Sequence, residues 1–224
     1  MLSRALAIAG KDLRLSAGGQ GLVQAVLLGL LLIFLFSLSQ PAGALVPAQA
    51  AAAIFWLSSA FGLVLVCNDL FGLEEVCSAR LGLLTAPVPP HAIWLGKGLA
   101  GLCLLALMQA VFLPAAVVFL GQDLRGAAWI LPAGLLVADL GLAAVGALLG
   151  ALAQGQAARE SLLSVILFPL LIPLMLAAIR VLAAAFSGSG ADDLSGWFGL
   201  GMAFDALFLG AGLILFPFVY TGEE

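Results

Sequence analysis

Three ionisable side chains lie inside apolar runs that are long enough to cross a bilayer: Asp139, Arg180 and Asp205. Charge in the core of a membrane is costly, so such residues are candidates for an ion pathway or for polar contacts between helices. Counted from the outer ends of their runs, Arg180 and Asp205 lie roughly 9 and 12 Å deep. We therefore predict that they form an ion pair, either within the chain or across a dimer.

Asp139 sits in the middle of another run and has no cation at its depth. We expect its carboxyl group either to be protonated, because burial favours the neutral form, or to line a water-filled cavity. A proton relay would need more such groups, which the apolar runs do not supply.

Other reactive chemistry is sparse. The chain has one histidine, His91, and its three cysteines (Cys67, Cys77 and Cys103) have no metal-binding spacing. No P-loop motif is present, so we expect no ATPase activity in this chain. The net charge of −4 includes no basic block, which argues against nucleic acid as a partner.

The rest of the chain is typical of an integral membrane protein, with 64% hydrophobic and 9% charged residues. Runs of about 20 apolar residues predict membrane-spanning helices. We expect six, at about 21–39, 49–68, 93–120, 127–153, 161–186 and 197–220. The sequence therefore predicts an all-α fold with a single transmembrane domain over residues 1–224.

Residues 1–16 predict a separate amphipathic helix that lies in the membrane interface. On a helical wheel Leu2, Leu6 and Leu13 share one arc with two alanines, and cations occupy the opposite arc. The cations are Arg4, Lys11 and Arg14. Such a helix places its apolar face in lipid and its cations at anionic headgroups.

The longest polar segment between spans covers residues 69–93. Leucines and a cysteine at offsets of three and four predict an amphipathic helix over 70–84, and Pro87, Pro89 and Pro90 end it. Trp94 and Lys97 then begin the next span, where we expect the lysine to extend its ammonium group to the interface. This segment is either a solvated loop with an interfacial helix or a docking site for a soluble partner.

Lysine and arginine predict the orientation of the chain. With the N-terminus inside, six of these cations lie in inner segments and two on or near the outer side. The positive-inside rule then places both termini in the cytoplasm.

Two backbone features mark the spans themselves. Pro169 and Pro173 lie four residues apart in the fifth span, which predicts a kink or a flexing point. Gly146 and Gly150 in the fourth span form a GxxxG pair that lets another helix approach closely.

Several of these strings resemble one family. Phe71, a helix, Pro87-Val88-Pro89 and a Gly-Lys entry to the third span are similar to the loop between spans two and three of ABC-2-type export permeases. The string FPLLIP at 168–173 and KDLRL at 11–15 resemble the haem exporter protein B family, the permease of cytochrome c maturation. The chain departs from that family at Cys77-Ser78-Ala79-Arg80-Leu81, where Asp-Gly-Ser-Leu-Glu is usual.

The resemblance implies a subunit of a bacterial inner-membrane ABC transporter. In the family, the loop at 69–93 is the coupling element that contacts an ATP-binding cassette subunit. The docking residues it implies are Leu73, Glu74, Glu75, Arg80, Leu81, Leu84, Pro87 and Pro89. It also implies a homodimer, a segment at 187–196 that re-enters the outer leaflet, and ATP bound by the partner subunit.

The implied role is haem export, or haem release to a periplasmic chaperone, beside a separate haem-handling membrane protein. We expect no cofactor bound by this chain and no catalytic activity. Three alternatives remain open: an ABC-2 exporter of lipid, polysaccharide or drug; a proton-driven secondary transporter that uses Asp139; and a membrane-embedded enzyme such as a lipid transferase. The last would need carboxylates or histidines clustered at one depth.

Overall fold

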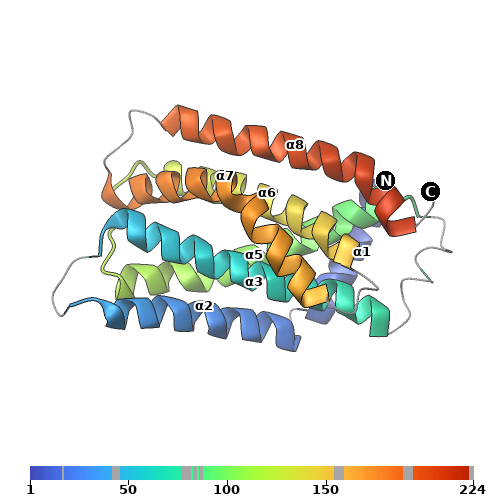
Figure 1. Cartoon of the computed structure of the whole chain (residues 1–224), viewed down its shortest axis with the longest axis horizontal. Coiled ribbons are helices and arrows are strands. Elements are labelled where there is room, and N and C mark those ends of the chain that lie inside the picture. The colour runs from blue at the N-terminus through green and yellow to red at the C-terminus, as the bar shows by residue number, and fades with distance from the viewer. Residues whose placement is uncertain are drawn as a thin grey trace.

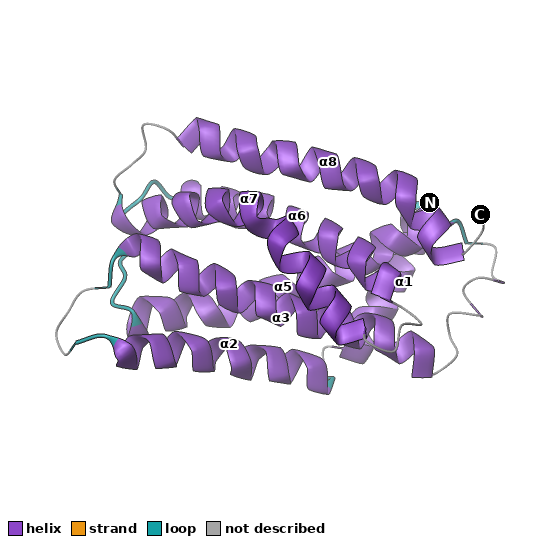
Figure 2. Cartoon of the chain, in the orientation of Figure 1, coloured by secondary structure: helices purple, strands orange, loops and turns teal. Residues whose placement is uncertain are grey.

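The computed structural model describes residues 1–16, 18–41, 46–76, 82, 85, 88–153, 159–188 and 194–221, without the side chains of 73–76, 159–164 and 221. Within these residues every regular element is an α-helix (Figure 2). The helices are α1 (Leu2–Ser16), α2 (Gln20–Ser39), α3 (Ala48–Val76), α5 (Pro90–Phe119), α6 (Ile130–Ala153), α7 (Arg159–Ser187) and α8 (Leu194–Thr221). The predicted all-α fold is confirmed.

Six of these helices contain a segment long and apolar enough to cross a membrane. The segments are Gln20–Ser39, Ala48–Gly72, Pro90–Phe119, Ile130–Ala153, Val165–Ser187 and Leu194–Tyr220. Each falls on one of the predicted runs, so the expected six spans are confirmed.

The spans form a bundle with α6 and α3 at its centre. α6 contacts α3, α5, α7 and α8, and its span is the most buried of the six. α2 and α8 lie at opposite edges of the bundle (Figure 1) and are the least buried. These two edge helices therefore present most of their surface to lipid or to partners.

The centre of the bundle is close-packed because α6 is rich in small residues. A Cβ at Gly146 would lie 3.0 Å from the Cys67 sulfur, and a Cβ at Gly150 would overlap the Phe71 ring. Both neighbours belong to α3, so the GxxxG pair fits its predicted role of letting a second helix approach.

One end of the bundle carries α1, the last turns of α3, the first turns of α5 and the end of α8 at Tyr220; we call this the loop end (Figure 1). α1 packs mainly against α5. Its buried face consists of Ala5, Ile8, Ala9, Asp12 and Ser16. Leu2 and Leu6 remain exposed beside that face. α1 therefore has one face packed on the protein, one exposed apolar face and one cationic face.

The polar segment differs from its prediction. Residues 69–76 continue α3 instead of starting a separate interfacial helix, because Leu70 and Phe71 are buried in the bundle. Residues 77–81, 83, 84, 86 and 87 lie outside the described residues. The predicted helix over 70–84 is therefore wrong at its start, and its second half, apart from residue 82, is outside the described part.

The middle of the predicted re-entrant segment at 187–196 lies outside the described residues. Residues on both sides of 189–193 belong to the long helices α7 and α8. α7 ends at Ser187 and is followed by Gly188, whose φ of +68° suits glycine and whose N–H donates a hydrogen bond to the Ala184 carbonyl (2.9 Å). Residues 189–193 fall outside the described residues, so a re-entrant segment at 187–196 stays a prediction.

Candidate functional site

The loop end is built around Lys97, about two turns into α5. Its side chain is fully buried. Lys97 Nζ donates a hydrogen bond to the carbonyl oxygen of Leu70 (3.1 Å) and lies 4.5 Å from the centroid of the Phe71 ring. Both of these residues belong to α3, so Lys97 joins the helices that precede and follow the 77–87 segment.

The same ammonium group reaches α1. Lys97 Nζ lies 3.6 Å from Oδ2 of Asp12, which is 4% exposed. This is an ion pair that is too long for a hydrogen bond. The other carboxylate oxygen of Asp12 lies 2.9 Å from Nζ of the exposed Lys11. The prediction that Lys97 extends to the membrane interface is therefore wrong, because a buried carboxylate on α1 holds it inside the protein.

Close packing reinforces this junction. A Cβ at Gly96 would lie 2.8 Å from Cβ of Ile8 and 2.9 Å from the Ala5 carbonyl oxygen, so glycine is needed for α1 to lie against α5. On the other side, the Phe71 ring under Lys97 rests against Gly150 of α6. We call Asp12, Lys97, Leu70 and Phe71 the Lys97 junction; it connects α1, α3 and α5 and borders α6.

A second carboxylate ties α3 to α2 at this end. The side chain of Asp69 lies against the first turn of α2, where a Cβ at Gly21 would be 2.6 Å from Cβ of Asp69. Negative charge is favourable at the N-terminus of a helix. A negatively charged Asp69 would therefore stabilise the N-terminus of α2.

The side chains of most predicted docking residues lie outside the described set. Leu73, Glu74 and Glu75 occupy the last turns of α3, with side chains outside the described set. Arg80, Leu81, Leu84 and Pro87 are outside the described residues altogether. Pro89 is the N-cap of α5, with Pro90 as its first helical residue, so the prolines start α5.

The buried carboxylate Asp139 has polar partners within the bundle. Gln109 Nε2 donates a hydrogen bond to Asp139 Oδ1 (2.7 Å) and lies 3.4 Å from the hydroxyl oxygen of Ser59. The three residues come from α6, α5 and α3. Sequence reasoning missed Gln109 and Ser59 because neither carries a charge, although a lone amide in an apolar span was a usable signal.

Asp205 and Arg180 do not form the predicted pair within this chain. The Arg180 guanidinium lies 5.6 Å from the ring centroid of Trp197, in a cation–π contact. Asp205 is 7% exposed and faces Gly141, where a Cβ would lie 2.5 Å from its Oδ1. Within the described residues this oxygen has no hydrogen-bond partner. Pairing within the chain is therefore wrong, and pairing across a dimer stays a prediction.

The proline pair in α7 lies in a continuous helix. Pro169 and Pro173 are both exposed, and α7 changes direction along its length (Figure 1). The predicted kink is present, and its use as a flexing point stays a prediction. Phe168, beside the first proline, packs against Phe61 of α3 with ring centroids 4.7 Å apart.

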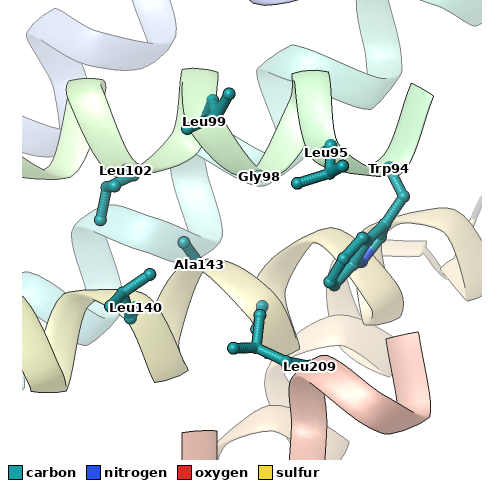
Figure 3. A pocket seen from close by; sticks show the side chains of 9 residues that line it. Trp94, Leu95, Gly98, Leu99, Leu102, Leu140, Ala143 and Leu209 are labelled. Atoms are coloured by element: carbon teal, nitrogen blue, oxygen red, sulfur yellow. The ribbon is translucent and has the colours of Figure 1, made fainter. Parts of the chain in front are cut away.

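A groove of about 70 Å³ opens between α5, α6 and α8 (Figure 3). Leu95, Leu99 and Leu102 form its α5 wall, and Leu140 and Ala143 face them from α6. Trp94 closes one end. It is buried against α8, where a Cβ at Gly212 would overlap its indole ring. Trp94 therefore packs two helices together.

The full-length comparison identifies the family. The profile of the CcmB protein family matches residues 3–221. The chain belongs to the CcmB family. No curated protein matches the chain. The resemblance seen in the loop and in the fifth span is thus confirmed over nearly the whole length.

Membership in the CcmB family fixes the general role. The chain is the permease subunit of the cytochrome c maturation ABC transporter, a multi-pass membrane component and not its catalytic subunit. The family also implies association with the ABC ATPase CcmA.

The described residues bring together no group of three histidine, cysteine, aspartate or glutamate side chains that could hold a metal ion. His91 lies half-buried in the first turn of α5, and Met108 packs against Gly62. That this CcmB-family chain binds no cofactor stays a prediction.

Proposed function

We propose that this subunit converts ATP-driven movement of CcmA into haem export, or into haem release to a periplasmic chaperone. The observation that carries the proposal is the Lys97 junction. It joins the end of α3 to the start of α5, the two helices that flank the segment at 77–87. A push on that segment would act on both helices together.

The coupling element in this proposal is the segment at 69–93. Its contacts with CcmA would come from Leu73, Glu74, Glu75, Arg80, Leu81, Leu84, Pro87 and Pro89. The two glutamates lie in the last turns of α3, directly beyond the junction. Movement of CcmA would then shift α3 and α5, with the prolines of α7 allowing that helix to follow.

The proposal places the chain in a bacterial inner membrane with both termini in the cytoplasm. Six cations of the inner segments support this orientation: Arg4, Lys11, Arg14, Arg80, Lys97 and Arg159. Fusing green fluorescent protein to the C-terminus tests it, because the fusion fluoresces only when it folds in the cytoplasm. Activity of a periplasmic alkaline phosphatase fusion at the same point would contradict this placement.

The partners in the proposal are CcmA, a second copy of this chain and a haem-handling membrane protein. Haem is then a ligand of the complex, and ATP is bound by CcmA. Arg180 and Asp205 remain candidates for contacts across the dimer.

The test is co-purification from the native membrane in mild detergent. We expect tagged wild-type protein to bring down CcmA and a haem-containing membrane protein. A variant with Leu81→Asp and Leu84→Asp should lose CcmA, because charge on the apolar side of the loop opposes docking. A variant with methionine at both positions is the matched control and should retain it.

Two results would separate the parts of this proposal. If CcmA co-purifies without any haem protein, coupling stands and the haem role falls, leaving an ABC exporter of another substrate. If CcmA is absent in several mild detergents, the docking role of the loop is wrong. A proton-driven transporter acting through Asp139 would then be the reading to test.

A further inference from the structure

The Lys97 junction contains more contacts than are needed to join the two spans α3 and α5. Joining α3 to α5 needs only Lys97, the Leu70 carbonyl and the Phe71 ring. Asp12 adds a third helix, and it does so with a buried carboxylate. Burying two charges is costly unless they lie close enough together for their attraction to offset the lost hydration. Asp12 on α1 and Lys97 on α5 form such a pair, which indicates that this contact specifies the position of α1.

The packing of α1 leads to the same conclusion. Gly96 precedes Lys97 and allows Ile8 and Ala5 to lie directly on α5. α1 contacts α5 far more extensively than it contacts α2 or α3. Apart from the covalent connection to α2, its attachment to the bundle therefore runs through the start of α5, next to the segment that we propose contacts CcmA.

The exposed side of α1 has the residues expected of a helix that lies on the membrane surface. Arg4, Lys11 and Arg14 are exposed there, beside Leu2 and Leu6. A helix with this pattern lies at the headgroup level of a membrane. If α5 shifts at its start, α1 shifts with it across the membrane surface.

We propose that Lys97 is the positioning residue that transmits movement from the coupling loop to α1, so that α1 and the ends of α3 and α5 at the loop end move as one unit. This inference rests on the proposed function, because it needs CcmA to act on the loop. It adds a second moving part, the interfacial helix, to a mechanism that otherwise involves only the spans.

The experiment uses the reconstituted complex with CcmA in proteoliposomes and two fluorescent reporter sites. One is Thr85→Cys, on an exposed residue of the loop, and the other is Ala7→Cys, on the exposed side of α1. Each is labelled with an environment-sensitive dye after the native cysteines are replaced by alanine or serine. In the otherwise wild-type protein, ATP should change the fluorescence at both sites.

The deciding variant is Lys97→Met, which keeps an apolar stem and removes the ammonium group. We expect the ATP-dependent change at Ala7→Cys to fall about fivefold or more, while the change at Thr85→Cys persists. Lys11→Met is the matched control, because Lys11 contacts the same Asp12 but is exposed; it should leave both signals intact. Asp12→Asn provides a second, nearly isosteric way to weaken the junction if Lys97→Met does not accumulate.

Three results would overturn the inference. The first is an unchanged ATP response at Ala7→Cys in both Lys97→Met and Asp12→Asn. The second is the absence of any ATP response at Ala7→Cys in wild type when Thr85→Cys responds. The third is an equal loss at both sites, which would make Lys97 a general folding contact. No response at Thr85→Cys in wild type would instead count against the proposed function itself.

Discussion

Charged side chains have different partners in the two halves of the bundle. At the loop end Asp12 and Lys97 come from separate helices and meet inside the protein. In the half of the bundle away from the loop end, Arg180 stacks on Trp197, and Asp205 has an oxygen without a hydrogen-bond partner in the described part of the chain. The loop end thus holds a buried ion pair between two helices. In the other half, the buried carboxylate of Asp205 has no such pair among the described residues.

The largest effect should come from breaking the matched pair. Lys97→Met removes the buried cation beside Asp12 and leaves its carboxylate with only the exposed Lys11 as a partner, so we expect the free energy of unfolding to fall by about 3 kcal/mol. The double variant Asp12→Leu/Lys97→Met should recover most of this loss. Equilibrium unfolding of purified protein in mild detergent measures both.

A double variant as unstable as the single one would show that the charge pair is not the cause. The lost hydrogen bond to the Leu70 carbonyl and the lost cation–π contact with Phe71 would then account for the effect.

A smaller effect should come from opening the α1–α5 contact without touching charge. A methyl group at Gly96 has to displace Ile8 and the Ala5 carbonyl, so Gly96→Ala should cost about 1–3 kcal/mol. Gly101→Ala is the matched control on the same helix, since a Cβ there meets nothing within 4 Å. Unfolding in detergent and protease cleavage near α1 measure the change; equal stability of the two variants would contradict the packing described here.

The smallest changes in stability are expected at the two carboxylates inside the membrane, Asp139 and Asp205, and we expect the two to differ. Asp139→Leu removes the acceptor of the Gln109 amide and should cost about 1–3 kcal/mol. Asp205→Leu removes no hydrogen bond or ion pair within the described part of the chain and keeps a side chain of similar shape beside Gly141, so we expect no loss of stability. If Asp205→Leu destabilises the isolated subunit as much as Asp139→Leu does, Asp205 has a partner within this chain after all.

The same comparison would be sharpened in the assembled complex. Asp205→Leu should matter there only if a neighbouring chain supplies a cation. A loss of complex assembly in Asp205→Leu, with a stable isolated subunit, would support pairing of Arg180 and Asp205 across a dimer.

Much of the fold could be predicted because apolar length determines it. The runs of about 20 apolar residues located all six spans, and the Gly146–Gly150 pair indicated close helix packing. The contacts of individual polar groups could not be predicted in this way. Lys97 next to the start of a span looks like a snorkelling residue until the fold brings Asp12 to it from α1.

The Arg180–Asp205 prediction failed for a related reason. Depth along a helix can be counted from sequence, but the direction of a side chain around the bundle depends on how the helices pack. Arg180 reaches the ring of Trp197 instead. For the docking loop, the three-residue spacing of Leu70 and Leu73 is equally compatible with an interfacial helix and with a longer second span. The burial of Leu70 shows that the second span, α3, is longer.

The contact between Asp12 and Lys97 also imposes an order on biosynthesis. Asp12 leaves the ribosome long before Lys97, and its buried environment does not exist until the span that carries Lys97 has been inserted. Until then α1 can only rest on the membrane surface with its carboxylate hydrated. α1 is thus made before α5 but fixed in place only after this third span has been inserted.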